Sequence, residues 1–245
     1  MSARWFTDDA AAGPAEIRPV LTPFEEMHFA AILEFAHNKA NHDWENLRCI
    51  DADGRRLYDM SVGYKCGPLT DKMKRAIAAK RGVRQWHNHP SQDSLSDSDW
   101  ICAASQTELE ILALNERGSI YVGRLIGWDE RLNHVFKGFW TLGGNLESHM
   151  GSLAVQRSLD IDLQVALSRF TAHVLNLALA TCCPEVRYAY AHLPAEREVL
   201  DACSALGIVE DGCVYAKAAI QKMLDEAPAD PADDAGDPGT GTPIV

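Results

Sequence analysis

The clearest periodic pattern of apolar and polar positions lies between residues 22 and 38. Apolar side chains recur there at the spacing of three and four residues that marks one face of a helix. Thr22 can cap such a helix, Pro23 suits its first position, and Glu25 completes a capping box with Thr22. The pattern therefore predicts an amphipathic helix that begins at Thr22 and ends near Asn38.

Short apolar runs bounded by turn residues predict strands. Residues 45–50 and 55–62 flank an Asp-Gly pair at 53–54, which is a strong hairpin signal. Residues 109–115 and 119–126 form a second pair of runs around a turn that contains glycine. We therefore expect two β-hairpins.

The segments around these hairpins are interpreted from weaker patterns. Residues 71–81 look helical, and residues 83–86 resemble a short strand that delivers His87 to a loop. A helix is expected to begin near Ser96, and residues 135–141 are expected to add one more strand. The order of elements indicates an α+β fold in which a mixed sheet is flanked by helices.

The carboxy-terminal part of the chain has a different character. Residues 150–180, 195–206 and 214–225 are helix-like and carry no evident site residues. Large apolar side chains are scarce at both ends of the chain, which is typical of segments without a packed core. The expected organisation is a flexible arm over 1–20, a domain with the predicted hairpins over 21–147, a helical carboxy-terminal region over 148–226 and a disordered tail over 227–245.

The composition is that of a soluble globular protein. The 245 residues are 47% hydrophobic and 24% charged, and no apolar run approaches the roughly 18 residues that span a bilayer. The amino terminus lacks the apolar stretch of a secretory signal. The seven cysteines include no Cys-x-x-Cys pair, which indicates reduced thiols rather than a disulfide framework. We expect a cytoplasmic protein that does not bind membranes.

The charge excludes one class of partner. The chain carries 35 acidic and 23 basic side chains, for a net charge of −12. A surface this negative repels phosphate backbones. We therefore expect no nucleic acid as the principal partner.

The segment from Trp86 to Trp100 contains the candidate chemistry. His87 and His89 are two residues apart, so their side chains point to the same side of a strand and can converge on one ion. Asp99, ten residues after His89, can supply a carboxylate as the third ligand. Three protein ligands and a water are the usual composition of a catalytic zinc site.

Each part of this segment also has a structural interpretation. A His-x-His sequence is common in polar loops, and Trp86 and Trp100 are most simply packing residues. Ser96 and Asp99 have the spacing of a helix capping box, which is compatible with a carboxylate that also faces a metal. Asp93 and Asp97 are alternatives to Asp99 as the third ligand.

The whole string His-Asn-His-Pro-Ser, followed by Leu-Ser-x-x-Asp, resembles the signature of the JAB/MPN (JAMM) family of zinc metalloproteases. The resemblance covers about residues 25–140 and implies an MPN/cytidine-deaminase-like sheet. It implies that His87, His89 and Asp99 bind one Zn²⁺ and that Ser96 helps to orient the site and to stabilise the oxyanion. The spacer between His89 and Ser96 is one residue shorter than in the commonest form of the signature.

The family also uses an upstream glutamate at the beginning of a strand as general base. Glu45 matches this position because it opens the first predicted strand after the amphipathic helix. The other interpretation of Glu45 is an exposed acid in a surface ion pair. Three glutamates inside the predicted helix (Glu25, Glu26 and Glu34) do not fit the family pattern.

The resemblance therefore predicts a zinc-dependent peptidase or isopeptidase. Its substrate would be a protein or peptide, with a ubiquitin-like protein or tag as one candidate. The alternatives are a catalytically silent MPN-type scaffold and an accessory protein of DNA repair or mobile elements. The carboxy-terminal helices offer a homodimer surface, a substrate platform or a cap.

Overall fold

The computed structural model describes residues 13–17, 21–38, 43–51, 55–62, 71, 75, 83–90, 94–104 and 110–228. Within these residues the fold is a mixed α+β arrangement with one seven-stranded sheet in the order β1-β7-β6-β5-β4-β2-β3. The strands are β1 (Gly13–Glu16), β2 (Glu45–Ile50), β3 (Arg56–Val62), β4 (Arg84–His89), β5 (Glu110–Asn115), β6 (Ile120–Leu125) and β7 (Val186–Ala191).

Both predicted hairpins are confirmed. Strands β2 and β3 pair antiparallel, as do β5 and β6. Strand β4 lies between the two hairpins, antiparallel to β2 and parallel to β5. The strand predicted to lead to His87 is therefore an interior strand of the sheet, and both histidines lie within it.

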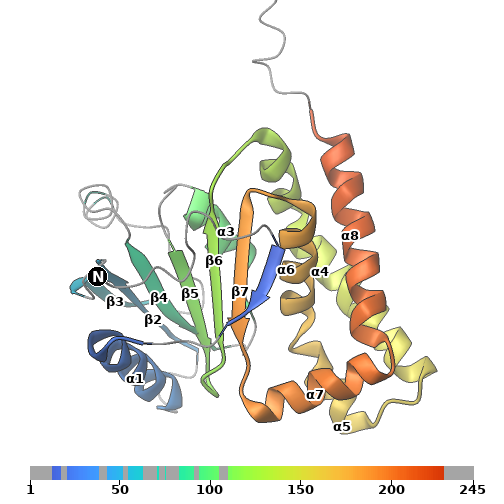
Figure 1. Cartoon of the computed structure of the whole chain (residues 1–245), viewed down its shortest axis with the longest axis horizontal. Helices are drawn as coiled ribbons and strands as arrows, with labels where there is room; N and C mark the ends of the chain where they lie inside the picture. The colour runs from blue at the N-terminus through green and yellow to red at the C-terminus, as the bar shows by residue number, and fades with distance from the viewer. Residues whose placement is uncertain are drawn as a thin grey trace, which may run out of the picture.

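Helices cover both faces of the sheet (Figure 1). They are α1 (Pro23–His37), α3 (Asp97–Ala104), α4 (Glu130–Gln156), α5 (Ile161–Ser168), α6 (Thr171–Cys182), α7 (Pro194–Ala205) and α8 (Ile208–Glu226). Helix α1 packs against β2, β4 and β5, whereas α3 packs against β5 and β6. Helix α6 contacts β1 and β7 and is itself covered by α4 and α8. The larger hydrophobic core lies among α3, α4, α6, α8 and the sheet.

The predicted start of α1 is confirmed. The Glu25 backbone N–H donates to the Thr22 hydroxyl, and the Thr22 backbone N–H donates to the Glu25 carboxylate. The same carboxylate pairs with Arg84 at the start of β4, and Arg84 also binds Glu110 of β5 at 3.1 Å. These buried ion pairs connect α1 to the two strands beneath it.

The strand expected at residues 135–141 is wrong, because these residues lie inside α4. Asp129 caps the start of α4, where its side chain accepts the Leu132 backbone N–H at 2.8 Å. Its buried apolar residues recur every three or four positions from Leu132 to Ala154, which is the spacing of a helix face. The seven residues from 135 to 141 are too few to show this helical spacing.

Two further expectations need correction. Residues 13–16, placed in a flexible arm, form β1, which pairs parallel with β7. The region over 148–226, expected to be helical, also contributes β7 between β1 and β6, in a part to which no helix was assigned. The expected boundary at residue 147 falls inside α4. The carboxy-terminal region therefore completes the sheet as well as supplying helices.

Some predictions fall outside the described residues. Of the helix expected at 71–81, only Asp71 and Arg75 are described, and both are helical. The tail expected over 227–245 lies outside them apart from residues 227 and 228. In the described part of the chain no single helix has the length and apolar character to cross a membrane. Helices α5 and α6, bent by 53°, reach that length and composition only as a pair.

Candidate metal centre

His87 and His89 lie on the same side of β4, and both are buried. Side chains two residues apart in a strand share a face, and the pairing of β4 with strands on both sides holds its backbone in register. The two Nε2 atoms are 2.8 Å apart. The strand therefore presents two imidazole nitrogens at one point.

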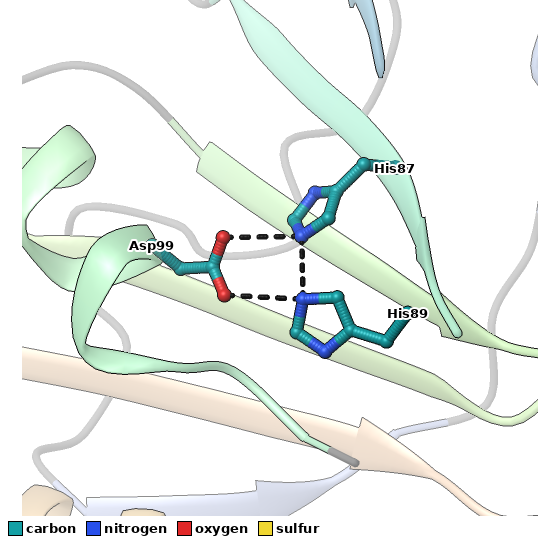
Figure 2. Close-up of side chains that lie close together, drawn as sticks. All are labelled: His87, His89 and Asp99. Atoms are coloured by element: carbon teal, nitrogen blue, oxygen red, sulfur yellow. Dashed lines mark hydrogen bonds and ion pairs between the residues drawn. The ribbon is translucent and has the colours of Figure 1, made fainter. Parts of the chain in front are cut away.

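Asp99 approaches the same point from the first turn of α3. Its Oδ1 lies 3.1 Å from His87 Nε2, and its Oδ2 lies 3.2 Å from His89 Nε2. Figure 2 shows the carboxylate facing both rings, one oxygen toward each. The structure thus brings together the three predicted ligands, two from a strand and one from the first turn of the following helix.

These three side chains fit a metal ion. All three are buried, and one ligand atom from each lies within 4.8 Å of the other two. Bonds of 2.0–2.1 Å in a tetrahedral site place ligand atoms about 3.3 Å apart. The observed separations of 2.8–3.2 Å approach this value, so only a small outward movement would admit an ion. The group can hold a metal, and its two nitrogens and one oxygen are compatible with zinc.

The environment favours the charged form of Asp99. Burial by itself would raise the pKa of this carboxyl group. The nearby His87 and His89, through charge and hydrogen bonds, outweigh burial and hold the pKa of Asp99 well below its usual value. Asp99 is therefore ionised at neutral pH, the form in which a carboxylate binds a divalent cation.

Ser96 and Asp99 form the predicted capping contact. The backbone N–H and the hydroxyl of Ser96 each donate to Asp99 Oδ2 at 2.7 Å, and the Asp99 N–H donates to Ser96 Oγ at 3.3 Å. The Ser96 proton is thus directed at the carboxylate. In this arrangement Ser96 orients Asp99, and it would have to rotate to donate to a substrate oxygen.

The rival carboxylates are distinguished by position. Asp97 is half-buried and accepts the Ser98 backbone N–H at 2.8 Å. It does not belong to the group formed with His87 and His89. Asp93 lies outside the described residues. Among the described carboxylates, Asp99 is the one that meets both histidines.

Glu45 lies at the start of β2, on the side of the sheet where the two histidines lie. Leu47 pairs with His87 across the antiparallel strands, so Glu45, two residues before Leu47, shares this face and lies toward His89. Glu45 is buried, and its Oε2 has no hydrogen-bond partner among the described residues. A buried carboxylate oxygen is stabilised by a hydrogen-bond donor, so Oε2 is suited to accept a proton from a group bound at the site.

Asn88 was not predicted as a site residue, yet it holds the backbone on both sides of Glu45. Its Oδ1 accepts the Asn46 N–H at 2.7 Å, and its Nδ2 donates to the Trp44 carbonyl at 3.0 Å. Asn88 occupies the middle position of His-Asn-His, between two predicted metal ligands. In the sequence, the signal for this role is that asparagine carries a side-chain amide, which can both donate and accept a hydrogen bond.

The two tryptophans that bracket the site are packing residues, as expected. Trp86 is completely buried on the α1 side of the sheet. Trp100 lies in the larger core, where its Nε1–H donates to Asn176 of α6 at 2.8 Å. Asn176 is a second residue that the sequence did not reveal, because no motif surrounds it.

Comparisons of the chain with protein-family models, with curated proteins and with solved structures gave no match.

Proposed function

We propose that this protein is a zinc-dependent amide hydrolase. The observation that carries the proposal is the placement of His87, His89 and Asp99 within reach of one ion, with Glu45 on the same face of the sheet. Three protein ligands leave a coordination position for water, as in catalytic zinc sites. The resemblance of this segment to the JAB/MPN signature supports the proposal, and with it an MPN-like version of the observed α+β fold.

The residues would divide the chemistry as follows. A zinc ion held by these side chains supplies a Lewis acid, which lowers the pKa of a coordinated water and polarises the scissile carbonyl. Glu45 accepts the proton of the attacking water on Oε2, which has no hydrogen-bond partner among the described residues, and returns it to the leaving amine. Ser96 orients Asp99 and, after rotation of its hydroxyl, can donate to the oxyanion.

The substrate we propose is a protein or peptide, and the leaving group is a backbone amine or a lysine side-chain amine. A ubiquitin-like protein or tag is the first candidate, because enzymes of the JAB/MPN family, whose signature this segment resembles, act on such conjugates. The net charge of −12 supports a protein substrate over a nucleic acid.

The first experiment measures metal content. Protein purified without added metal and then dialysed against Zn²⁺ should hold about one zinc per chain, and His87→Ala should hold much less. His134→Ala serves as the control because His134 lies in α4, outside the ligand group. No zinc in the wild-type protein, or equal zinc in His87→Ala, would overturn the metal site.

The second experiment separates metal binding from catalysis. Wild type and Glu45→Gln are incubated with ubiquitin-like conjugates and with a peptide library, and mass spectrometry records the cleaved bonds. We expect Glu45→Gln to keep its zinc and to lose cleavage. If the zinc-loaded wild type cleaves nothing, the catalytically silent scaffold replaces the hydrolase as the better explanation. If Glu45→Gln cleaves normally, Glu45 is not the base.

A further inference from the structure

Asn176 of α6 is completely buried and contacts the segment that carries Asp99 at three points. Its Oδ1 accepts the Nε1–H of Trp100 at 2.8 Å. Its Nδ2 donates to the Leu95 carbonyl at 2.8 Å and to the Ser94 hydroxyl at 3.1 Å. All three partner atoms belong to residues that lie in the protein interior, where a hydrogen bond that is lost is not replaced by water.

The chemistry of the partners fixes the orientation of the Asn176 amide. An indole N–H only donates and a backbone carbonyl only accepts. Trp100 therefore requires the amide oxygen, and Leu95 requires the amide nitrogen. A side chain that can only accept would leave the Leu95 carbonyl unpaired, and a side chain that can only donate would leave the Trp100 N–H unpaired. Asparagine satisfies all of them.

The three contacts surround the cap that orients the metal ligand. Leu95 immediately precedes Ser96, and Trp100 immediately follows Asp99. Asn176 thus holds the chain on both sides of the Ser96–Asp99 capping contact, in which two donors of Ser96 meet Asp99 Oδ2. A movement of either end would shift the carboxylate relative to the histidines on β4.

Two further buried residues, Tyr188 and His173, continue the chain of hydrogen bonds that begins at Asn176 and Ser94, and both are uncharged. The Ser94 hydroxyl lies 2.7 Å from the Tyr188 hydroxyl, which lies 2.8 Å from His173 Nδ1. Burial raises the pKa of Tyr188 well above its usual value and lowers that of His173 well below. Both groups are therefore neutral at neutral pH, and their contribution to the site is positional.

The opposite side of the same segment is held by the sheet. A Cβ atom on Gly123 of β6 would lie 2.5 Å from Leu95 Cδ1 and 2.7 Å from Trp100 Cη2. Leu95 and Trp100 thus pack directly on the β6 backbone, while Asn176 binds their polar groups. The segment is confined between β6 and α6.

We propose that Asn176 is a positioning residue of the metal centre, which sets its affinity for zinc by fixing Asp99. The inference rests on the proposed zinc site and assigns part of that site to a helix far along the chain. Groups that hydrogen-bond directly to metal ligands, as Ser96 does to Asp99, typically change metal affinity by 10–100-fold when they are replaced, and Asn176 holds the segment that carries this contact.

The test measures binding of Zn²⁺ alone, by competition with a chromophoric chelator, at a temperature where circular dichroism shows every variant folded. Asn176→Ala should bind Zn²⁺ at least about tenfold more weakly than wild type. Leu175→Ala is the matched control, because Leu175 is buried on the same helix and its side chain lies near Gly143 of α4. We expect less than about a twofold change for Leu175→Ala despite its loss of stability.

A second variant keeps the proposal testable if Asn176→Ala does not fold. Trp100→Phe removes the indole N–H and retains an aromatic ring, and it should also weaken Zn²⁺ binding. Combined with Asn176→Ala, it should add less than its separate effect, because both changes break the same bond.

Three results would overturn the inference. They are unchanged affinity in both Asn176→Ala and Trp100→Phe, an equal loss in Leu175→Ala, and full additivity in the double variant. Absence of Zn²⁺ binding by the wild-type protein would instead remove the proposed metal site itself, and the inference with it.

Discussion

The side-chain oxygen of Asn88 accepts the backbone N–H of Asn46 at 2.7 Å, and this bond joins β4 to β2 beside Glu45. The second bond of Asn88, to the Trp44 carbonyl, lies on the other side of Glu45. The residue between the two histidines thus connects the strand of the metal ligands to the proposed base. Because Asn88 and Asn46 are both buried, water cannot easily replace the bond between them.

This relationship predicts the behaviour of Asn88→Ala. The Asn46 amide should exchange its hydrogen about tenfold faster, as expected for the loss of one buried hydrogen bond worth about 1.4 kcal/mol. The Zn²⁺ stoichiometry should stay unchanged, since no metal ligand is altered. Hydrogen exchange followed by NMR provides the measurement, with Asn133→Ala on the surface of α4 as control. Unchanged protection of Asn46 would contradict the assigned contact.

A comparison of two aspartates two residues apart tests the ligand assignment. Asp99→Asn removes the charge that faces His87 and His89, so affinity for Zn²⁺ should fall by roughly 100-fold or more. Asp97→Asn changes the same chemical group in the same helical turn and should leave affinity within about twofold. Isothermal titration with Zn²⁺ measures both. Equal losses in the two variants would show that general charge, rather than ligation, controls binding.

The buried His192 predicts a pH dependence of stability. Burial, followed by the charge of Arg197, lowers the pKa of His192 from 6.5 to about 4. Between these two values the unfolded chain binds a proton that the folded chain does not, so the free energy of unfolding decreases as the pH falls through this window. The full contribution is present above pH 6.5, and its loss amounts to roughly 2–3 kcal/mol at pH 4.

Urea unfolding between pH 7.5 and 4.5 measures this dependence. The experiment contains a chelator, so that protonation of metal-bound ligands does not contribute. His192→Gln should show a shallower decline than wild type, because glutamine has no proton to bind in the unfolded chain. His149→Gln is the control, since His149 is partly exposed and stacks on Tyr215 in another part of the molecule. Parallel curves for wild type and His192→Gln would refute the prediction.

Two glycines should respond in opposite directions to the same substitution. Gly123→Ala places a Cβ against Leu95 and Trp100 and should lower the free energy of unfolding by about 1–3 kcal/mol. Gly144 lies inside α4 with no atom within 4 Å of an added Cβ, so Gly144→Ala should raise stability by about 0.5–1 kcal/mol. Chemical denaturation measures both variants. A neutral Gly123→Ala would mean that the segment before α3 is not tightly packed on β6.

Local interactions were readable from the sequence. The capping box of Thr22 and Glu25 and the Ser96–Asp99 cap each involve residues three positions apart, and the hairpin joins two strands that follow one another closely in the chain. Such contacts depend on the geometry of one turn, which residue types and spacing specify. The interpretation of residues 135–141 failed because a short window does not distinguish a strand from one side of a long helix.

The sequence by itself determined that His87 and His89 share one side of a strand and that Ser96 and Asp99 share one helical turn. Only the tertiary structure decided that these two units meet, and that Asn88 and Asn176 hold them. The bond from Asn88 to Asn46 spans 42 positions, and that from Asn176 to Leu95 spans 81. Contacts at such separations depend on how the strands pair and which helix covers each face, and local periodicity carries no record of either.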